Sequence, residues 1–254
     1  MIEWERLRAD NPGPFTLSGT NTWVLGRDPA WIVDPGPALG AHLDAIARAV
    51  AARGGAGGIA ITHDHPDHVD GVPGLLERLG GAVPVAAARY EGADVRLADG
   101  DAFGPLRVVA TPGHAPDHLA FAAGAIGCSG DAVLGEGSVF VAPGPRAMAG
   151  YLDALERLLA LELDVVLPGH GPPVTDPRAK LEEYLAHRRD RERRLLEALA
   201  AGARSEAELL DAVWDDVPPA LRGAAAVTLA AHLGKLEEEG RLPGGVERRD
   251  FGPG

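Results

Sequence analysis

The segment Ile59-Ala-Ile-Thr-His-Asp-His-Pro-Asp-His68 decides how this sequence is interpreted. It begins as a short apolar run of the kind that forms a buried strand. Side chains two residues apart on an extended chain face the same side, so His63 and His65 can bind one metal ion together. Asp67 and His68 follow in the loop beyond the strand and can turn toward a second ion. Imidazole and carboxylate groups are suitable zinc ligands at neutral pH, so the spacing predicts a metal site.

Three further apolar runs end in the same way, at a glycine-containing turn with a metal-binding side chain in or just after it. The runs and the side chains that follow them are Leu106–Ala110 with His114, Ala125–Cys128 with Asp131, and Asp164–Leu167 with His170. Active sites of layered α/β proteins collect at strand ends. We therefore expect these three side chains to join the first cluster, because chance would otherwise have to produce the pattern three times.

The bulk composition limits the classes of function. The chain has 254 residues, 46% of them apolar, and its 34 glycines and 21 prolines indicate many turns between short elements. The single cysteine, Cys128, excludes an intramolecular disulfide, and we interpret it as a small core residue. The formal net charge of −13 argues against a general attraction to phosphate backbones, although it leaves room for a local basic groove.

The sequence contains no segment typical of export or of a membrane span. Residues Met1–Asp10 are charged and lack the apolar run of a signal peptide. No stretch approaches the roughly 20 apolar residues that a membrane-spanning helix needs. We therefore expect a cytoplasmic protein that does not enter membranes.

The character of the chain changes near residue 177. Residues 1–176 alternate short apolar runs with helical patterns, which predicts a layered α/β catalytic domain. Besides the runs above, we expect strands at Thr22–Leu25 and Trp31–Val33, and helices at Ala41–Arg53, Gly74–Leu79 and Ala149–Leu161.

Residues 177–254 are predicted to form a small winged-helix-like α domain. Ser205 followed by Glu208 is a capping-box signature at the start of a helix. We expect three helices and then a β-hairpin wing, over Ala179–Ala201, Ser205–Trp214, Pro218–Gly240 and residues 241–248. Outside the metal motifs, His42, His187 and His232 lie in helical patterns and are interpreted as ordinary surface or partly packed residues.

The order of the metal-binding motifs resembles the metallo-β-lactamase superfamily, whose fold is a four-layer αββα sandwich. The resemblance implies two zinc ions per chain, each held by three side chains, with one carboxylate bridging them. The first set is His63, His65 and His114, the second is Asp67, His68 and His170, and the bridge is Asp131. Asp34, in Ile32-Val-Asp-Pro-Gly36, matches the superfamily's first motif, a carboxylate that braces the site; the alternative is a simple turn former.

This arrangement predicts a hydrolase in which a metal-bridging hydroxide attacks a carbonyl carbon or a phosphorus atom. Asp67 would orient that nucleophile and take its proton. His118 follows His114 by four positions and either donates a proton to the leaving group or has a structural role. Asp70 stands where the superfamily more often has glycine, so it either adds a hydrogen bond near the site or marks a helix start.

Further stretches resemble the β-lactamase-like protein 2 family, and the resemblance covers almost the whole chain. They are Asn11–Trp23, Glu183–Arg188 and His232–Gly240. Animal members of that family are single-strand endoribonucleases, and fungal relatives are thioesterases that release polyketides from acyl carriers. The resemblance therefore implies an ester, thioester or single-stranded RNA substrate.

The sequence leaves several functions open. Superfamily members that reduce oxygen at two irons typically carry Glu where His65 stands, so zinc is favoured, but a one-iron persulfide oxygenase is compatible with the ligands. The basic cluster Arg188–Arg194 is either a path for RNA or a solvated helix face. The third helix ends in Glu237–Glu239, which suits packing or homodimerisation better than nucleic acid. The rival from another class is a non-catalytic, metal-responsive winged-helix regulator that binds nucleic acid.

Overall fold

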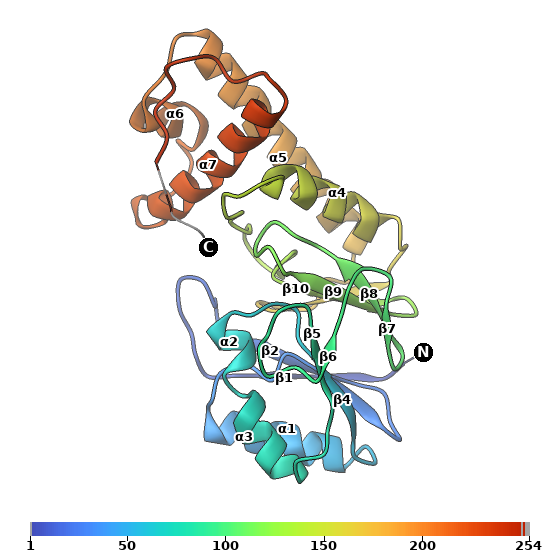
Figure 1. Ribbon diagram of the computed structural model, residues 1–254. Coiled ribbons are helices and arrows are strands. Elements are labelled where there is room, and N and C mark those ends of the chain that lie inside the picture. The colour runs from blue at the N-terminus through green and yellow to red at the C-terminus, as the bar shows by residue number, and fades with distance from the viewer. Residues whose placement is uncertain (1, 250, 252–254) are drawn as a thin grey trace.

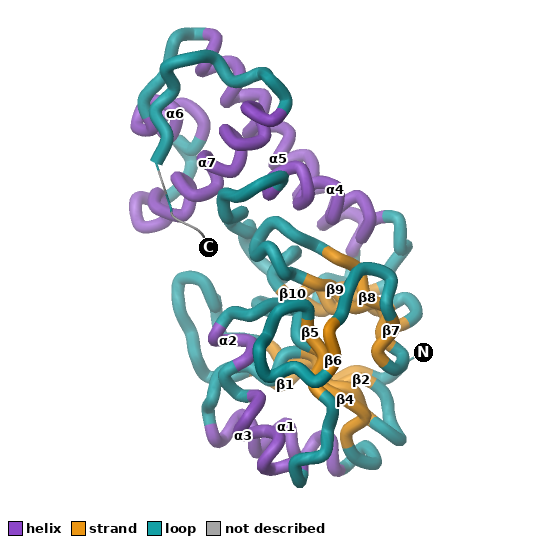
Figure 2. The backbone as a smooth tube through the Cα atoms, viewed as in Figure 1, coloured by secondary structure: helices purple, strands orange, loops and turns teal. Residues whose placement is uncertain are grey.

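The computed structural model describes residues 2–249 and 251 (Figure 1). Two β-sheets pack face to face, and helices cover the outer face of each (Figures 1 and 2). The first sheet has the strand order β1-β2-β3-β4-β5-β6. Its strands are β1 (Trp4–Arg8), β2 (Asn21–Leu25), β3 (Ala30–Val33), β4 (Ala56–Ala60), β5 (Val85–Ala87) and β6 (Val95–Arg96). Pairing is antiparallel from β1 to β3 and parallel from β3 to β6.

The second sheet has the order β11-β10-β9-β8-β7. Its strands are β7 (Ala102–Phe103), β8 (Leu106–Ala110), β9 (Leu119–Ala123), β10 (Ile126–Gly130) and β11 (Val165–Pro168). Only the pair β10–β11 is parallel. Every residue of β9 and β10 is buried, because one face of these strands meets the first sheet and the other meets a helix layer.

Each layer of the sandwich has its own apolar contacts. Trp23 and Val33 of the first sheet pack with Phe121 and Cys128 of the second, so Cys128 is a buried core residue, as predicted. Helices α1 (Gly40–Ala51) and α3 (Val72–Leu79) cover the first sheet. Helices α4 (Ala147–Leu159) and α5 (Pro177–Ala200) cover the second. The predicted four-layer αββα sandwich is confirmed, and every predicted strand lies within two residues of an observed one.

The C-terminal helices form a separate core. The second half of α5 packs with α6 (Glu206–Val213) and α7 (Arg222–Glu238). A single 3₁₀ turn at Pro219–Leu221 lies directly before α7. The capping box is present, since Ser205 accepts from the Glu208 backbone N–H and the Glu208 side chain accepts from the Ser205 N–H. None of the helices in the described chain is both long and apolar enough to cross a bilayer.

The predicted hairpin wing is wrong. The described part of the tail, residues 241–249, turns at Gly244–Gly245 but contains no paired strand. Leu242 and Val246 pack against the helical core instead of alternating across a ladder. Pro243 also removes one of the backbone donors that such a ladder would need.

Candidate metal centre and substrate cavity

The strand ends of both sheets meet at one edge of the sandwich and bring the metal-binding motifs together. The chain leaves β4 at Ala60 and reaches His63 within three residues. The short helix α2 (Pro66–Val69) then follows, with proline in its first turn, and carries Asp67 and His68. His114, Asp131 and His170 follow β8, β10 and β11 in the second sheet.

His63, His65 and His114 form the first group of ligand atoms. The Nε2 atom of His63 lies 2.9 Å from Nδ1 of His65, and Nε2 of His114 lies 3.2 Å from the same atom. All three ligand atoms lie within 4.8 Å of one another. This spacing suits three ligands that share one cation.

Asp67, His68 and His170 form the second group. Oδ2 of Asp67 lies 3.5 Å from Nε2 of His68 and 3.4 Å from Nε2 of His170. These ligand atoms also fall within 4.8 Å of one another. Both groups therefore contain the same residues that the superfamily resemblance assigned to them.

Asp131 lies between the two groups. Its Oδ1 is 3.6 Å from Nε2 of His68, and its Oδ2 is 3.6 Å from Nε2 of His114 and 3.3 Å from Nε2 of His170. The backbone of Gly169 approaches this carboxylate so closely that a Cβ there would lie 2.3 Å from Oδ1. Only glycine fits at that position, which explains the residue before His170.

The histidines share a common pattern of hydrogen bonds on the side facing away from the cluster. In four of them the outer nitrogen, Nδ1, contacts an oxygen atom, which leaves Nε2 to face the cluster. The pairs are His63 with Thr62 Oγ1 at 2.9 Å, His68 with Asp34 Oδ2 at 2.9 Å, His114 with the Phe140 carbonyl at 3.4 Å, and His170 with the Gly19 carbonyl at 3.4 Å. Such outer contacts orient histidines that bind metals and fix their tautomers.

Asp34 occupies the bracing position that its motif implied. Its backbone is left-handed, with φ of 53°, and its carboxylate is buried. One oxygen accepts the Thr62 N–H at 2.8 Å, and the other accepts both the Thr62 hydroxyl at 2.8 Å and the His68 Nδ1–H. Because the Thr62 hydroxyl donates to Asp34, it can accept from His63, so one carboxylate orients two of the histidines.

The residues fit a pair of divalent cations. Nε2 of His68 and Oδ1 of Asp131 are buried and have no hydrogen-bond partner among the described residues, although they face one another. Buried polar atoms without partners are costly and rare. Imidazole nitrogen and carboxylate oxygen together are a donor set that suits zinc, and bound cations would satisfy both orphaned atoms.

The electrostatics of the cluster also favour cations. Burial opposes ionisation of Asp67, but the hydrogen bond from His170 and the charge of His68 lower its pKa to about 2. Burial likewise opposes protonation of His68, but the carboxylates of Asp131 and Asp34 raise its pKa to about 9. His114 faces Asp131 but contacts the Phe140 carbonyl where His68 contacts Asp34, and burial lowers its pKa to about 4. The carboxylates thus attract positive charge, which is a proton on His68 in the metal-free chain, while His114 is neutral at pH 7.

His118 is placed differently from the ligands. It is buried, its Nδ1 contacts Thr111 Oγ1 at 2.7 Å, and its Nε2 accepts the Asp131 N–H at 3.0 Å. Burial lowers its pKa well below the ordinary value. With both ring nitrogens engaged and no contact with the cavity, the geometry favours a structural role over proton donation to a leaving group.

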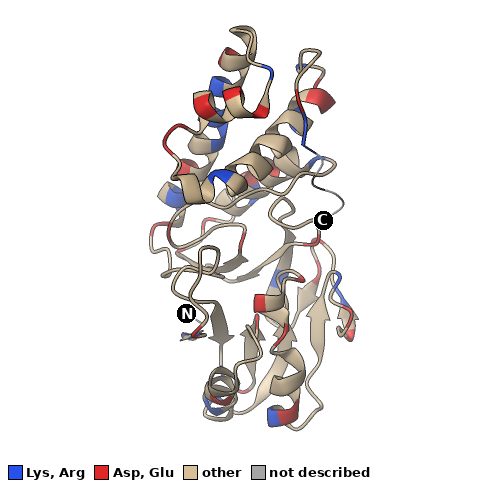
Figure 3. Cartoon of the chain, turned by 90° about the vertical axis from the view of Figure 1, so that its left-hand side faces the viewer, with Lys and Arg blue, Asp and Glu red and all other residues tan. Residues whose placement is uncertain are grey.

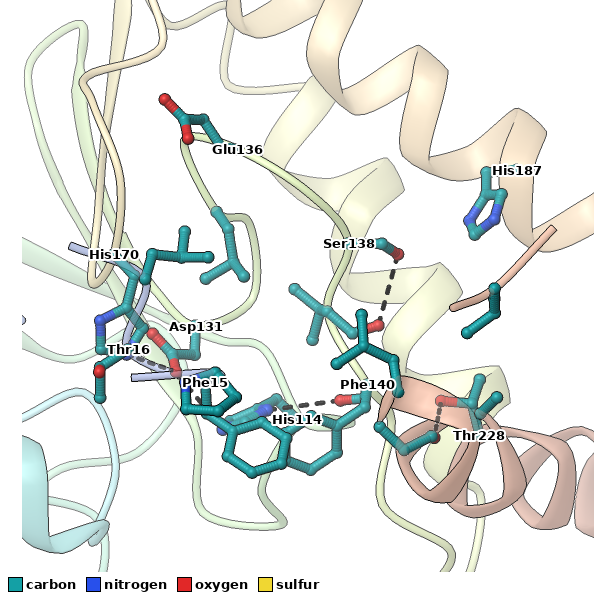
Figure 4. A pocket seen from close by; sticks show the side chains of 18 of the residues that line it. Phe15, Thr16, His114, Asp131, Glu136, Ser138, Phe140, His170, His187 and Thr228 are labelled. Atoms are coloured by element: carbon teal, nitrogen blue, oxygen red, sulfur yellow. Dashed lines mark hydrogen bonds and ion pairs between the residues drawn. The ribbon is translucent and has the colours of Figure 1, made fainter. Parts of the chain in front are cut away.

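A cavity of about 610 Å³ extends from the ligands toward the C-terminal helices (Figure 4). Its floor includes His65, His114, Asp131 and His170, and its far walls come from α5, α7 and the segment before α7. Most of the remaining lining is apolar, with Phe15, Leu134, Val139, Phe140, Val217, Leu221 and Ala224. Phe15 and Phe140 stack edge to face, with ring centroids 5.7 Å apart, next to His114. A cavity of this size and character suits a small organic ligand.

Comparison with known proteins agrees with this site. A β-lactamase-like protein 2 homolog from Drosophila melanogaster is 31% identical over 265 residues, which cover 93% of this chain and 88% of the relative. The chain belongs to the β-lactamase-like protein 2 family. Residues 205–242 also match the family described as the Beta-lactamase associated winged helix domain, which confirms the predicted class of the C-terminal domain.

Two further similarities extend the assignment. An atrochrysone carboxyl ACP thioesterase from Aspergillus chevalieri is 32% identical over 268 residues, covering 96% of this chain and 85% of the relative. A β-lactamase domain protein from Burkholderia ambifaria has a TM-score of 0.77 at 25% identity, covering 94% and 86% of the two chains. This β-lactamase-like protein 2 family member is therefore a metal-dependent hydrolase of the metallo-β-lactamase superfamily.

The basic cluster of this family member is largely neutralised by its surroundings. Four of its five arginines have a carboxylate partner: Arg189 with Glu156, Arg191 with Asp216, Arg193 with Asp190 and Glu197, and Arg194 with Asp215. Acidic and basic residues are accordingly interspersed along the C-terminal helices (Figure 3). Arg189 and Arg193 are exposed, as on a solvated helix face, whereas Arg188 and Arg191 are buried.

Some residues around the site were missed or misjudged from the sequence. Thr20 donates to Oδ2 of Asp67 at 3.0 Å, and its place in Ser18-Gly-Thr20, between two strands, gave only a weak signal. Asp70 is exposed, and its backbone N–H closes α2, so it marks the end of that helix and not a helix start. The interpretation of His42 and His232 as ordinary surface or partly packed residues is wrong, since both are buried.

Proposed function

We propose that this chain is a binuclear zinc hydrolase that cleaves esters or thioesters. The observation that carries the proposal is the combination of braced histidines, whose free nitrogens converge with two carboxylates, and an apolar cavity that opens directly onto them. His63, His65 and His114 would hold one zinc ion, Asp67, His68 and His170 the other, and Asp131 both. When bound, such ions supply a water of lowered pKa and polarise the substrate carbonyl.

Asp67 would orient the attacking water. It lines the cavity, its side chain is 27% exposed, and its carboxylate is ionised at neutral pH. Thr20 holds one of its oxygens by a hydrogen bond, which fixes the carboxylate in place. Asp67 is thus able to accept a hydrogen bond from a water that approaches from the cavity.

His118 would act as a positioning residue. Its Nε2 accepts the backbone N–H of Asp131, so it holds the carboxylate that both groups of ligands share. The described cavity wall contains no imidazole other than the ligands and His187, and so no evident group to protonate a leaving alkoxide close to the cluster. A thiol has a pKa near about 8.5, so a thiolate leaves without such help. This supports a thioester over RNA.

The charges of the cavity support the same choice. RNA binding depends on free lysines and arginines that displace counterions from phosphates. Among the described residues, the cations that line the cavity are Arg188 and Arg191, and Arg191 is paired with Asp216. We therefore do not propose RNA as the substrate, and the experiment below includes RNA cleavage as a result that would contradict the acyl assignment.

The test compares substrates on the zinc-loaded protein. Acyl thioesters, esters and unstructured RNA would be offered to the wild type and to Asp67→Ala, with metal content measured in each preparation. We expect thioester turnover that is lost in Asp67→Ala and about two zinc ions per chain. RNA cleavage without thioester turnover would reject the acyl assignment, and full activity of the metal-free protein would reject the metal centre.

The same preparations test the oxygenase and the nucleic-acid-binding regulator. Iron in place of zinc, with oxygen consumed in the presence of a persulfide, would favour the one-iron oxygenase. Binding of DNA that persists in His68→Ala, without hydrolysis of any ester, would favour the regulator. The cytoplasmic location and the homodimer through the C-terminal domain stay predictions, which cell fractionation and analytical ultracentrifugation would check.

A further inference from the structure

Arg188 differs from the rest of the basic cluster in having no acidic partner. Its side chain is almost fully buried, and no carboxylate of the described residues lies within ion-pair distance. Its Nη2 donates to Ser138 Oγ at 3.1 Å and to the Val139 carbonyl, and its guanidinium lies over the Tyr151 ring at 5.4 Å. Burying a cation without a counter-charge is costly, so such a group requires an explanation.

The guanidinium also has unused hydrogen-bonding capacity. An arginine carries five N–H donors. Among the described residues, Nε of Arg188 is buried without a partner, and no hydrogen bond from Nη1 is present. Nε is buried, but Arg188 lines the cavity, so its charge and the donors of Nη1 are available to a ligand there.

His187 adds a second donor beside it. Its Nε2 accepts from Nε of Arg191 at 3.2 Å, so the ring hydrogen must be on Nδ1. Burial, and then the charges of Arg188 and Arg191, lower its pKa to about 4, so the ring is neutral at pH 7. His187 and Ser138, the Arg188 partner, lie across the cavity from Asp131 and His170 (Figure 4).

The carboxylates that also line the cavity do not cancel this charge. Both oxygens of Asp216 accept from Arg191 at 2.8 Å. Glu136 is exposed and lies away from His187 in Figure 4. Leu134, Val139 and Phe140 line the cavity as apolar residues. The cavity thus has a metal-binding end, an apolar middle and an uncompensated cation.

We propose that Arg188, assisted by His187, forms an oxyanion subsite in the cavity, and that the substrate is an acyl compound carrying a carboxylate or phosphate remote from its reacting carbonyl. The identity of the reacting bond rests on the proposed function, but the subsite itself does not. The competing explanation is that Arg188 only braces the loop of Ser138 and Val139, which leads to Phe140 and its contact with His114.

Equilibrium binding separates the two explanations. Dicarboxylic acids from succinate to sebacate, and monocarboxylic acids of matched length, would be titrated calorimetrically into the zinc-loaded wild type. Acids with a terminal phosphate in place of the second carboxylate distinguish the two sources of oxyanion. A charge-assisted hydrogen bond favours the doubly charged probe by about ten- to a hundredfold at the matching length.

The variants assign that preference to a residue. Arg188→Met should abolish it and leave binding of the monocarboxylic acid nearly unchanged, Arg188→Lys should retain part of it, and Arg189→Met, which removes an exposed paired arginine, should leave it intact. Equal weakening of both acids in Arg188→Met would show a brace only. If the wild type binds dicarboxylic and monocarboxylic acids equally well at every chain length, the proposed subsite is wrong, whatever the variants show. If the preference is present but only RNA is cleaved, the proposed reaction fails and the subsite stands.

Discussion

The cluster of candidate metal ligands and the arginine run 188–194 both bring many ionisable side chains together. They differ in whether these side chains have hydrogen-bond or ion-pair partners within the chain. In the cluster, the outer Nδ1 atoms of four histidines contact oxygen atoms, whereas two inner atoms, Nε2 of His68 and Oδ1 of Asp131, have no hydrogen-bond partner among the described residues. In the arginine run, four of five charges end on a carboxylate of the same chain. Polar groups that bind a ligand lack a protein partner in the folded chain. Polar groups that stabilise the fold have their partners within the same chain. Arg188 belongs, by this criterion, with the cluster.

The largest expected effect comes from removing a carboxylate of the cluster. Asp67→Ala deletes a ligand and the group that orients water, so hydrolysis should fall by at least about a thousandfold. Metal content should fall toward one ion per chain, measured by mass spectrometry of the metals. Asp64→Ala is the matched control, because Asp64 lies in the same motif but is exposed. Equal losses in both variants would contradict the assignment.

Removing the brace should weaken the metal site without destroying it. Asp34→Ala releases the Nδ1–H of His68 and the Thr62 hydroxyl, so metal affinity should fall by about ten- to a hundredfold, as for other such outer contacts. Competition with a chelator measures this. Asp70→Ala, which removes an exposed carboxylate nearby, should bind metal like the wild type; a loss of affinity there would revive a role for Asp70.

The arginine run should respond in stability instead of metal binding. Arg191→Met removes bonds to Asp216 and to the Val213 carbonyl and a contact with the Trp214 ring, and should lower the free energy of unfolding by about 2 kcal/mol. Arg193→Met removes exposed pairs only and should leave it unchanged. Urea unfolding gives both values. The comparison fails if either variant keeps its stability and loses thioester hydrolysis or bound metal instead.

The smallest expected effect at neutral pH comes from His232, which should make stability depend on pH below about 6.5. Burial, then the charge of Arg188, lowers its pKa to about 3, and neither ring nitrogen has a partner among the described residues. The unfolded chain takes up this proton near pH 6.5, before the folded chain does. Stability should therefore fall as pH decreases from about 6.5 toward about 3, by at most about 1.4 kcal/mol per pH unit. The slope for His232→Leu should be shallower than for the wild type in that window; parallel curves would show that His232 does not contribute.

The convergence of the candidate ligands could be predicted from the sequence because each follows an apolar strand, and strand ends gather at one edge of a layered sheet. Their braces could not. Whether Thr20 reaches Asp67, or the Phe140 carbonyl reaches His114, depends on how distant loops are packed. The same limit applies to the arginines, because partners such as Glu156 and Asp216 come from other segments. The sequence shows how many charged residues a segment contains, but it does not show which residues of other segments form ion pairs with them.

Helix α5 limits how the molecule can be divided. Its first half places Leu181, Tyr184 and Leu185 in the apolar layer with α4, and its second half places Leu195 and Leu199 in the C-terminal core. Its 24 residues form one rod about 36 Å long. A chain cut at residue 176, where the composition changes, would lose part of the sandwich's own packing. If the C-terminal helices were gained, lost or exchanged in evolution, the change would therefore have to lie after α5. The sandwich would keep α5 as part of its outer helix layer.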